Sequence, residues 1–159
     1  MLANIASEEL RPMIGMPAET FILHRPPMLF LDRLVDIGAR SATCEWRISD
    51  DFGLVVAGHG VPAYAGVEYM AQCVAVHAGA RARARGFAPP LGYLLGTRHY
   101  KCSRTWFETG VTYQATCREL VRDSMGMGSF ACRILLDGES IAEANLAVLE
   151  QPHETRLDD

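Results

Sequence analysis

The chain has 159 residues, of which 49% are hydrophobic and 21% are charged, and its formal net charge is −4. This length and composition predict one soluble globular domain over residues 1–159, with its core at about 20–150. The negative charge and the absence of a basic stripe argue against nucleic acid as a partner, and no apolar run is long enough to cross a membrane.

Residues 1–9 lack the basic and apolar regions of a secretory signal, so none is expected. The five cysteines contain no CxxC pair, and the five histidines show no HxxxH spacing. The sequence therefore indicates neither a disulfide framework nor a zinc site. We expect a cytoplasmic protein whose cysteines are small core residues, with no metal and no cofactor.

The first predicted elements are a short helix and two strands. Ser7 is a candidate cap for a helix that reaches about residue 14. A strand is predicted near 28–37. From Thr43 to Ile48 apolar and polar residues alternate, which is typical of a half-buried antiparallel strand.

The long helix that follows is the most informative segment. Glycines and prolines lead into residues 66–85, where apolar side chains recur at steps of three and four. Gly86 ends this helix, and Glu68 lies in its first turn. A carboxylate on an otherwise apolar helix is costly unless it is paired or used. Glu68 is therefore the first candidate for a catalytic acid or base, and a helix-stabilising charge is the alternative.

The remaining sequence predicts strands again, and Asp137-Gly138 between the last two is a strong hairpin signal. The tail from Gln151 is expected to be frayed. Only the long helix has enough apolar length to cover a face of the sheet. The fold class is therefore α+β, with a five- to six-stranded antiparallel sheet around one long central helix. The four late strands are predicted at 91–102, 111–120, 127–136 and 139–150.

Several motifs together resemble the 3-hydroxyacyl-[acyl-carrier-protein] dehydratase family. The segment 23–33, LHRPPMLFLDR, resembles its opening LPHRxPxLLxDR motif, and 68–72, EYMAQ, resembles its EAMAQ helix. Residues 94–96 with 106–110 are similar to a later strand and turn, and 135–144 to the closing hairpin. Within the family, residues 62–72 look most like the divergent dehydratases linked to aryl-polyene lipid clusters.

This resemblance implies a hotdog fold, in which the sheet wraps around the helix, and at least a homodimer. It also implies dehydration of a 3-hydroxyacyl thioester on acyl carrier protein to the trans-2-enoyl thioester, in fatty-acid or aryl-polyene-type lipid synthesis. A base removes the α-proton, an acid protonates the leaving hydroxyl, and donors stabilise the thioester oxygen. The resemblance gives Glu68 the role of acid or proton shuttle.

The base has two candidates in this sequence. The family carries its catalytic His in a Gly-His-Phe-Pro element, and an ungapped alignment puts Leu54 there. His59 lies between two glycines and nine positions before Glu68, so it is either the base on a shortened loop or an exposed loop residue. His24, in the opening motif, either takes over as base or only holds its loop by hydrogen bonds.

Other residues are candidates for binding. The backbone N–H groups of Gly96, Gly66 and Val67 resemble the family's donors to the thioester oxygen, although Gly96 is equally consistent with a β-bulge. Gln72, one turn after Glu68, either holds its carboxyl or is an ordinary core-edge residue. The acyl chain is expected to contact Met70, Val74, Tyr93 and Phe107.

Arg81, Arg83 and Arg85 form the only dense positive cluster. At a helix C-terminus these charges complement the helix dipole. The other interpretation is a docking surface for acidic acyl carrier protein, which Lys101 and Arg104 extend. Two rival functions also stay open: a non-catalytic acyl-binding or partner subunit, and a hotdog acyl thioesterase in which Glu68 activates water.

Overall fold

A computed structural model describes residues 6–152 and 155–157 of the chain. No secretory signal was expected in residues 1–9, and residues 1–5 of this stretch lie outside the described part. Within the described residues, none of the helices combines the length and the apolar character needed to cross a membrane.

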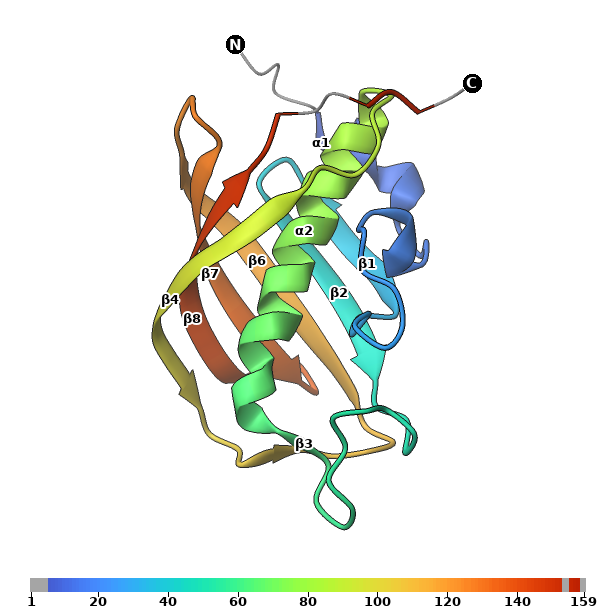
Figure 1. Ribbon diagram of the computed structural model, residues 1–159, viewed down its shortest axis with the longest axis vertical. Coiled ribbons are helices and arrows are strands. Elements are labelled where there is room, and N and C mark those ends of the chain that lie inside the picture. Colours follow the sequence, from blue (N-terminus) through green and yellow to red (C-terminus); the bar gives the residue numbers. More distant parts are fainter. Residues whose placement is uncertain (1–5, 153–154, 158–159) are drawn as a thin grey trace.

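Six strands form one antiparallel sheet in the order β1-β2-β6-β7-β8-β4, and the helix α2 (Gly66–Ala84) lies across one face of it (Figure 1). This is the hotdog arrangement that the motifs implied. Two short strands, β3 and β5, pair with each other beside the start of α2. The strands are β1 (Arg33–Gly38), β2 (Ser41–Arg47), β3 (Val61–Pro62), β4 (Gly92–Cys102), β5 (Trp106–Phe107), β6 (Thr112–Arg122), β7 (Met127–Leu136) and β8 (Glu139–Glu150).

The alternating pattern placed β2 correctly, since Cys44, Trp46 and Ile48 are all buried. The hairpin signal is also confirmed. Asp137 and Gly138 have φ angles of 50° and 81°, the left-handed conformation that a tight two-residue hairpin requires.

The strand expected at 28–37 is shorter than predicted and begins only at Arg33. The reason lies in the hydrogen bonds of the segment before it. The N–H of Phe30 and the carbonyl of Met28 both bond to the side chain of Gln72 on α2 instead of to a strand. These residues therefore form a loop that is fixed to the helix.

The helix α2 is enclosed on more sides than a single apolar stripe predicts. Besides Met70 and Val74, it buries Tyr69, Cys73 and Val76. The sheet covers one side, and the segment 14–32 packs on another, as the blue chain in Figure 1 shows. A helix with buried residues nearly all round is the expected core of such an arrangement.

The N-terminus differs from the prediction in its cap and in its burial. The α-helix α1 (Ser7–Leu10) is followed by a 3₁₀ helix (Arg11–Met13), and two more 3₁₀ turns lie at Ala18–Thr20 and Ala63–Ala65. Ser7 does not cap α1, because its hydroxyl accepts a hydrogen bond from the N–H of Ala39 at 3.3 Å. Leu10 is fully buried, so the core begins well before residue 20.

The C-terminal tail is not frayed in its described part. The N–H of Gln151 donates to the carbonyl of Leu91, and the N–H of Leu157 donates to that of Gly86. The guanidinium of Arg156 lies 5.3 Å from the ring centre of Phe87. The tail therefore packs against the segment that links α2 to β4; residues 153–154 and 158–159 lie outside the described structure.

Gly79 fixes the distance between α2 and the segment 14–32. A Cβ atom at this position would collide with the carbonyl group of Phe21. Glycine inside a helix normally costs about 1 kcal/mol relative to alanine. Its presence here allows the backbone that precedes the opening motif to lie directly on the helix.

Gly79→Ala is therefore expected to destabilise the protein by about 1–3 kcal/mol, although the same change in an open helix would stabilise it. Urea unfolding of the purified variant measures this. The opposite substitution at a less crowded position of the same helix, Ala75→Gly, measures the effect of helix propensity alone. A more stable Gly79→Ala variant would contradict the close packing.

Candidate functional site

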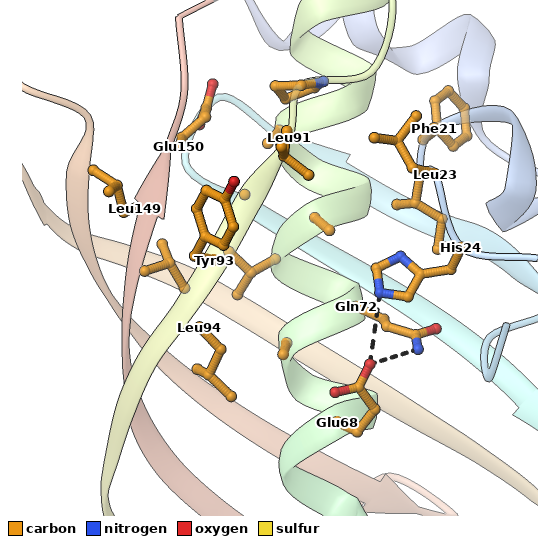
Figure 2. A pocket seen from close by; sticks show the side chains of 18 of the residues that line it. Phe21, Leu23, His24, Glu68, Gln72, Leu91, Tyr93, Leu94, Leu149 and Glu150 are labelled. Atoms are coloured by element: carbon orange, nitrogen blue, oxygen red, sulfur yellow. Dashed lines mark hydrogen bonds and ion pairs between the residues drawn. The ribbon is translucent and has the colours of Figure 1, made fainter. Parts of the chain in front are cut away.

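A cavity of about 200 Å³ runs beside α2, between the segment 21–24 on one side and strands β4 and β8 on the other. Figure 2 shows its side chains, with Glu68 and His24 near one end and Tyr93, Leu91 and Glu150 toward the other. The wall between these ends is mainly apolar. An apolar groove with a few polar groups at one point is the usual form of a small-molecule site.

The polar groups at the near end are His24 and Glu68. The imidazole Nε2 atom lies 3.6 Å from Glu68 Oε1, and each side chain is 36% exposed. This separation is longer than a hydrogen bond, so the two groups face each other with a small gap. The Nδ1 atom of His24 is buried and has no hydrogen-bond partner among the described residues. Nε2 is therefore the nitrogen that faces the carboxylate.

Gln72 fixes the Glu68 carboxylate. Its amide is fully buried, and its Oε1 atom accepts from the N–H of Phe30 at 2.9 Å. Its Nε2 atom donates to the carbonyl of Met28 and to Glu68 Oε1, both at 2.8 Å. Because the Phe30 N–H requires an acceptor, the amide can be oriented only with its NH₂ group toward the carboxylate. Of the two alternatives for Gln72, this hydrogen bond agrees with the one in which the amide holds the Glu68 carboxyl.

Gln72→Leu is expected to lower the free energy of unfolding by about 2–6 kcal/mol. The variant leaves the Phe30 N–H and the Met28 carbonyl buried without a partner, and each such group costs about 1–3 kcal/mol. Urea unfolding measures the loss, with the exposed Gln151→Leu as the matched control. Equal stability of the two variants would contradict the structural role of the amide.

His59 lies apart from this pair. Its ring stacks on Trp106 with 4.7 Å between the ring centres, at an interplanar angle of 21°. It is absent from the residues that line the cavity beside Glu68. Within one chain, the structure therefore brings His24 to Glu68 and leaves His59 on the loop before β3.

The three candidate donors also lie outside the cavity lining. Gly66 and Val67 begin α2, and the N–H of Gly66 already donates to the carbonyl of Ala63. Gly96 is an exposed position of β4 beside a register shift, and a Cβ atom placed there would meet no other atom within 4 Å. The alternative interpretation of Gly96, a β-bulge, therefore fits its position.

Of the four residues expected to contact the acyl chain, two line the cavity and two do not. Val74 and Tyr93 line it. Met70 of α2 and Phe107 of β5 are instead fully buried in the core. Periodicity marks both helix faces as apolar, so it could not tell the face toward the sheet from the face toward the groove.

The arginine cluster divides between two surroundings. Arg83 is exposed, whereas Arg81 is mostly buried, with an Nη1 atom 3.6 Å from Glu119. Burial and the nearby charge of Arg122 lower the pKa of Arg81. Arg81 and Arg85 line a second cavity next to the first. The three side chains therefore do not form one exposed patch.

Sequence reasoning missed the polar group at the far end of the groove. Arg122 Nη1 donates to Glu150 Oε2 at 2.6 Å, and Arg122 Nε donates to Glu119 at 2.9 Å. Burial disfavours the guanidinium charge, but the bonds to these carboxylates outweigh it and raise the pKa of Arg122. Arg122 lies on β6 and Glu150 on β8, and each of these strands pairs with β7 and not with the other. No local sequence pattern therefore connects the two residues.

No group of three His, Cys, Asp or Glu side chains in the described part of the chain is arranged to hold a metal ion. The cysteines are core residues as expected, since Cys44, Cys73, Cys117 and Cys132 are buried and Cys102 is partly buried.

Comparison with known proteins gives a family match over most of the chain. The model of the ApeP-like family, described as ApeP dehydratase, matches residues 16–157. No curated protein sequence matches significantly. This family match agrees with the resemblance that the motifs indicated.

Solved structures support the same fold. The dehydratase heterocomplex ApeI:P from Xenorhabdus doucetiae is 25% identical over 86% of this chain and 92% of that chain, with a TM-score of 0.80. The conserved protein PA5202 from Pseudomonas aeruginosa is 12% identical over 84% and 98%, with a TM-score of 0.63. A hypothetical thioesterase with coenzyme A from Streptococcus pneumoniae TIGR4 is 6% identical over 79% and 88%, with a TM-score of 0.57. At such low identity the last two show the fold alone.

Proposed function

The chain belongs to the ApeP-like dehydratase family, and on this basis we propose that it removes water from a 3-hydroxyacyl thioester carried on acyl carrier protein. The product is the trans-2-enoyl thioester. The observation that carries the proposal is the pair of His24 and Glu68, which face each other at 3.6 Å at one end of an apolar groove. The groove matches an acyl chain, and the pair matches the two proton transfers of a dehydration.

In this mechanism Glu68 starts protonated, and His24 starts as a neutral imidazole whose Nε2 atom can accept a proton. His24 Nε2 removes the proton from the carbon next to the thioester carbonyl. Glu68 donates its proton to the hydroxyl on the following carbon, so water leaves as the double bond forms. The proton on His24 then returns to Glu68 across the gap, which resets the pair.

Gln72 is a positioning residue for this chemistry. Its N–H bond to Oε1 of Glu68 holds the carboxyl toward the groove and stabilises the carboxylate that remains after proton donation. The bonds of Gln72 to Met28 and Phe30 also fix the loop that follows His24 against the helix. One amide therefore positions both sides of the pair.

A second subunit belongs to the proposal. The strand β4 is an edge of the sheet, and its Tyr93, Leu94 and Leu95 are between 42% and 50% exposed. An exposed apolar edge strand is a template for pairing with another chain. We infer a homodimer through this edge, which would cover the open side of the groove. The similar ApeI:P protein is a heterocomplex, so a different hotdog subunit is the alternative occupant.

The test is intact-mass measurement of a 3-hydroxyacyl acyl carrier protein after incubation with the purified protein. Loss of one water from the carrier is the expected result. Release of the free thiol would instead identify a thioesterase. An unchanged carrier mass with the protein alone, and loss of water only after addition of a second hotdog subunit, would replace the homodimer with a heterocomplex. No change under either condition would contradict the proposed reaction.

A further inference from the structure

The face of the sheet that points away from α2 carries a hollow of its own. Strands β2, β6 and β7 are neighbours in the sheet and lie behind the helix in Figure 1. Along each strand buried residues alternate with more exposed ones, and the exposed set points away from the core. A cavity of about 230 Å³ opens among these outward residues. It shares no lining residue with the groove beside Glu68.

Two guanidinium groups, three hydroxyl groups and one small side chain surround this hollow. They belong to Arg118, Arg133, Ser41, Thr43, Thr116 and Ala131. In the strand register Arg118 lies opposite Ala131, and Arg133 lies opposite Thr116. The two arginines are therefore diagonal neighbours on one face of the sheet, close enough for long side chains to interact. The short side chain of Ala131 leaves the space beside them open.

The charges of the two arginines are not neutralised by other side chains. In the part of the chain that the structure describes, neither Arg118 nor Arg133 forms an ion pair. Glu119 follows Arg118 in the sequence, but its carboxylate turns toward the helix, where it lies 3.6 Å from Arg81. Glu143 lies opposite Arg133 on β8 without an ion pair between them. The residues that line the hollow thus bring two positive charges and no acidic group.

The hydroxyl groups add donors to the same face. Thr43 lies opposite Thr116, and Ser41 lies opposite Arg118. Within residues 6–152 and 155–157, the side chains of these three hydroxyl residues donate no hydrogen bond to another protein group. A hydroxyl proton rotates to meet an acceptor, and a guanidinium presents five N–H donors in a planar fork. A hollow lined by donors and positive charge is the complement of an oxyanion.

A phosphate group uses this arrangement better than a carboxylate does. A guanidinium binds two phosphate oxygens with parallel hydrogen bonds. Two arginines therefore engage different oxygens of one phosphate, and the hydroxyl groups donate to the same oxygens. Like charges at neighbouring positions of a sheet repel each other. A phosphomonoester carries about 1.5–2 negative charges at pH 7 and relieves this repulsion more fully than a singly charged anion.

We propose that the hollow formed by Arg118, Arg133 and the hydroxyl groups beside them is a binding site for a phosphate group. The phosphate is either free inorganic phosphate or the terminal group of a small phosphomonoester, and both present the same oxygens. The site lies on the face of the sheet away from His24 and Glu68, so it takes no part in the proton transfers. It does not depend on the reaction proposed for the groove.

The test is calorimetric titration of the purified protein at low ionic strength, in a buffer without phosphate or sulfate. The probes are inorganic phosphate, glycerol 3-phosphate and dimethyl phosphate, which has one charge and two blocked oxygens. The protein is expected to bind one equivalent of at least one of the first two probes about tenfold or more tightly than dimethyl phosphate. Tighter binding of glycerol 3-phosphate identifies a phosphomonoester as the ligand, and tighter binding of inorganic phosphate identifies the free ion.

Three variants locate the effect. Arg118→Gln and Arg133→Gln are each expected to weaken the binding about tenfold or more, whereas Arg47→Gln keeps it. Arg47 is exposed on the same face of β2 and does not line the hollow. Ala131→Leu fills the hollow and leaves both arginines in place, and it is also expected to weaken binding about tenfold or more. Thermal unfolding confirms that each variant is folded.

Equal binding of all three probes, or an equal loss in Arg47→Gln, would overturn the site, because either result indicates general attraction of anions to positive charge. The absence of detectable binding would overturn it as well, and so would an Ala131→Leu variant that binds as the wild type does. The water-loss assay in phosphate-free buffer separates this result from the proposed function. Water loss without phosphate binding removes this site alone, and phosphate binding without water loss removes the dehydratase alone.

Discussion

Glu68→Gln is expected to lower the rate of water loss from a 3-hydroxyacyl carrier protein by about 10²–10⁴-fold. The substitution keeps the size and the hydrogen-bonding shape of the side chain, but the amide has no acidic proton to give to the leaving hydroxyl. Because Gln72 and the first turn of α2 hold this position, the variant is expected to fold as the wild type does. Single-turnover assays by intact mass measure the loss directly.

The control for this substitution is Glu8→Gln. Glu8 is also a first-turn glutamate, in the short helix α1, and it is exposed. Its replacement changes the net charge by the same amount and is expected to leave the rate unchanged. A Glu68→Gln variant that keeps most of its activity would show that the carboxyl only stabilises the helix.

His24→Gln is expected to reduce water loss by a similar factor, about 10²–10⁴-fold, since the variant lacks the base for the α-proton. The matched comparison is His59→Gln. His59 stacks on Trp106 and does not line the groove, so its replacement is expected to leave the rate near that of the wild type. The same assay measures both variants.

The opposite outcome has a specific meaning. Loss of activity in His59→Gln, with His24→Gln fully active, would assign the base to His59 on the loop before β3. Circular dichroism of both variants excludes a general loss of fold. The two histidines are thus separated by one pair of substitutions.

The fold was largely predictable because its strongest signals are local. Each of these signals is a pattern of residues that are close together in the sequence. They are the alternation in β2, the Asp137-Gly138 turn and the long apolar run of α2. The segment before β1 was not predictable in this way. The backbone groups of Met28 and Phe30 form hydrogen bonds with the side chain of Gln72, more than forty positions later. No periodicity in the sequence predicts that partner.

The site was predictable only at its helix end. The cost of a carboxylate on an apolar helix identified Glu68, and the helical spacing identified Gln72. Which of the two histidines lies beside Glu68 depends on how the segment 14–32 packs on α2. At Gly79 the missing side chain leaves room for the backbone of Phe21. The Arg122–Glu150 pair depends on strand order across the sheet, which a single sequence does not contain.

The most direct test of the central claim is a double-variant cycle on the water-loss assay. If His24 and Glu68 act as one proton-transferring pair, Glu68→Gln combined with His24→Gln is expected to be no slower than the slower single variant, because either change alone disables the pair. If the two losses multiply in the double variant, the residues act independently, and the account of a shared proton is contradicted.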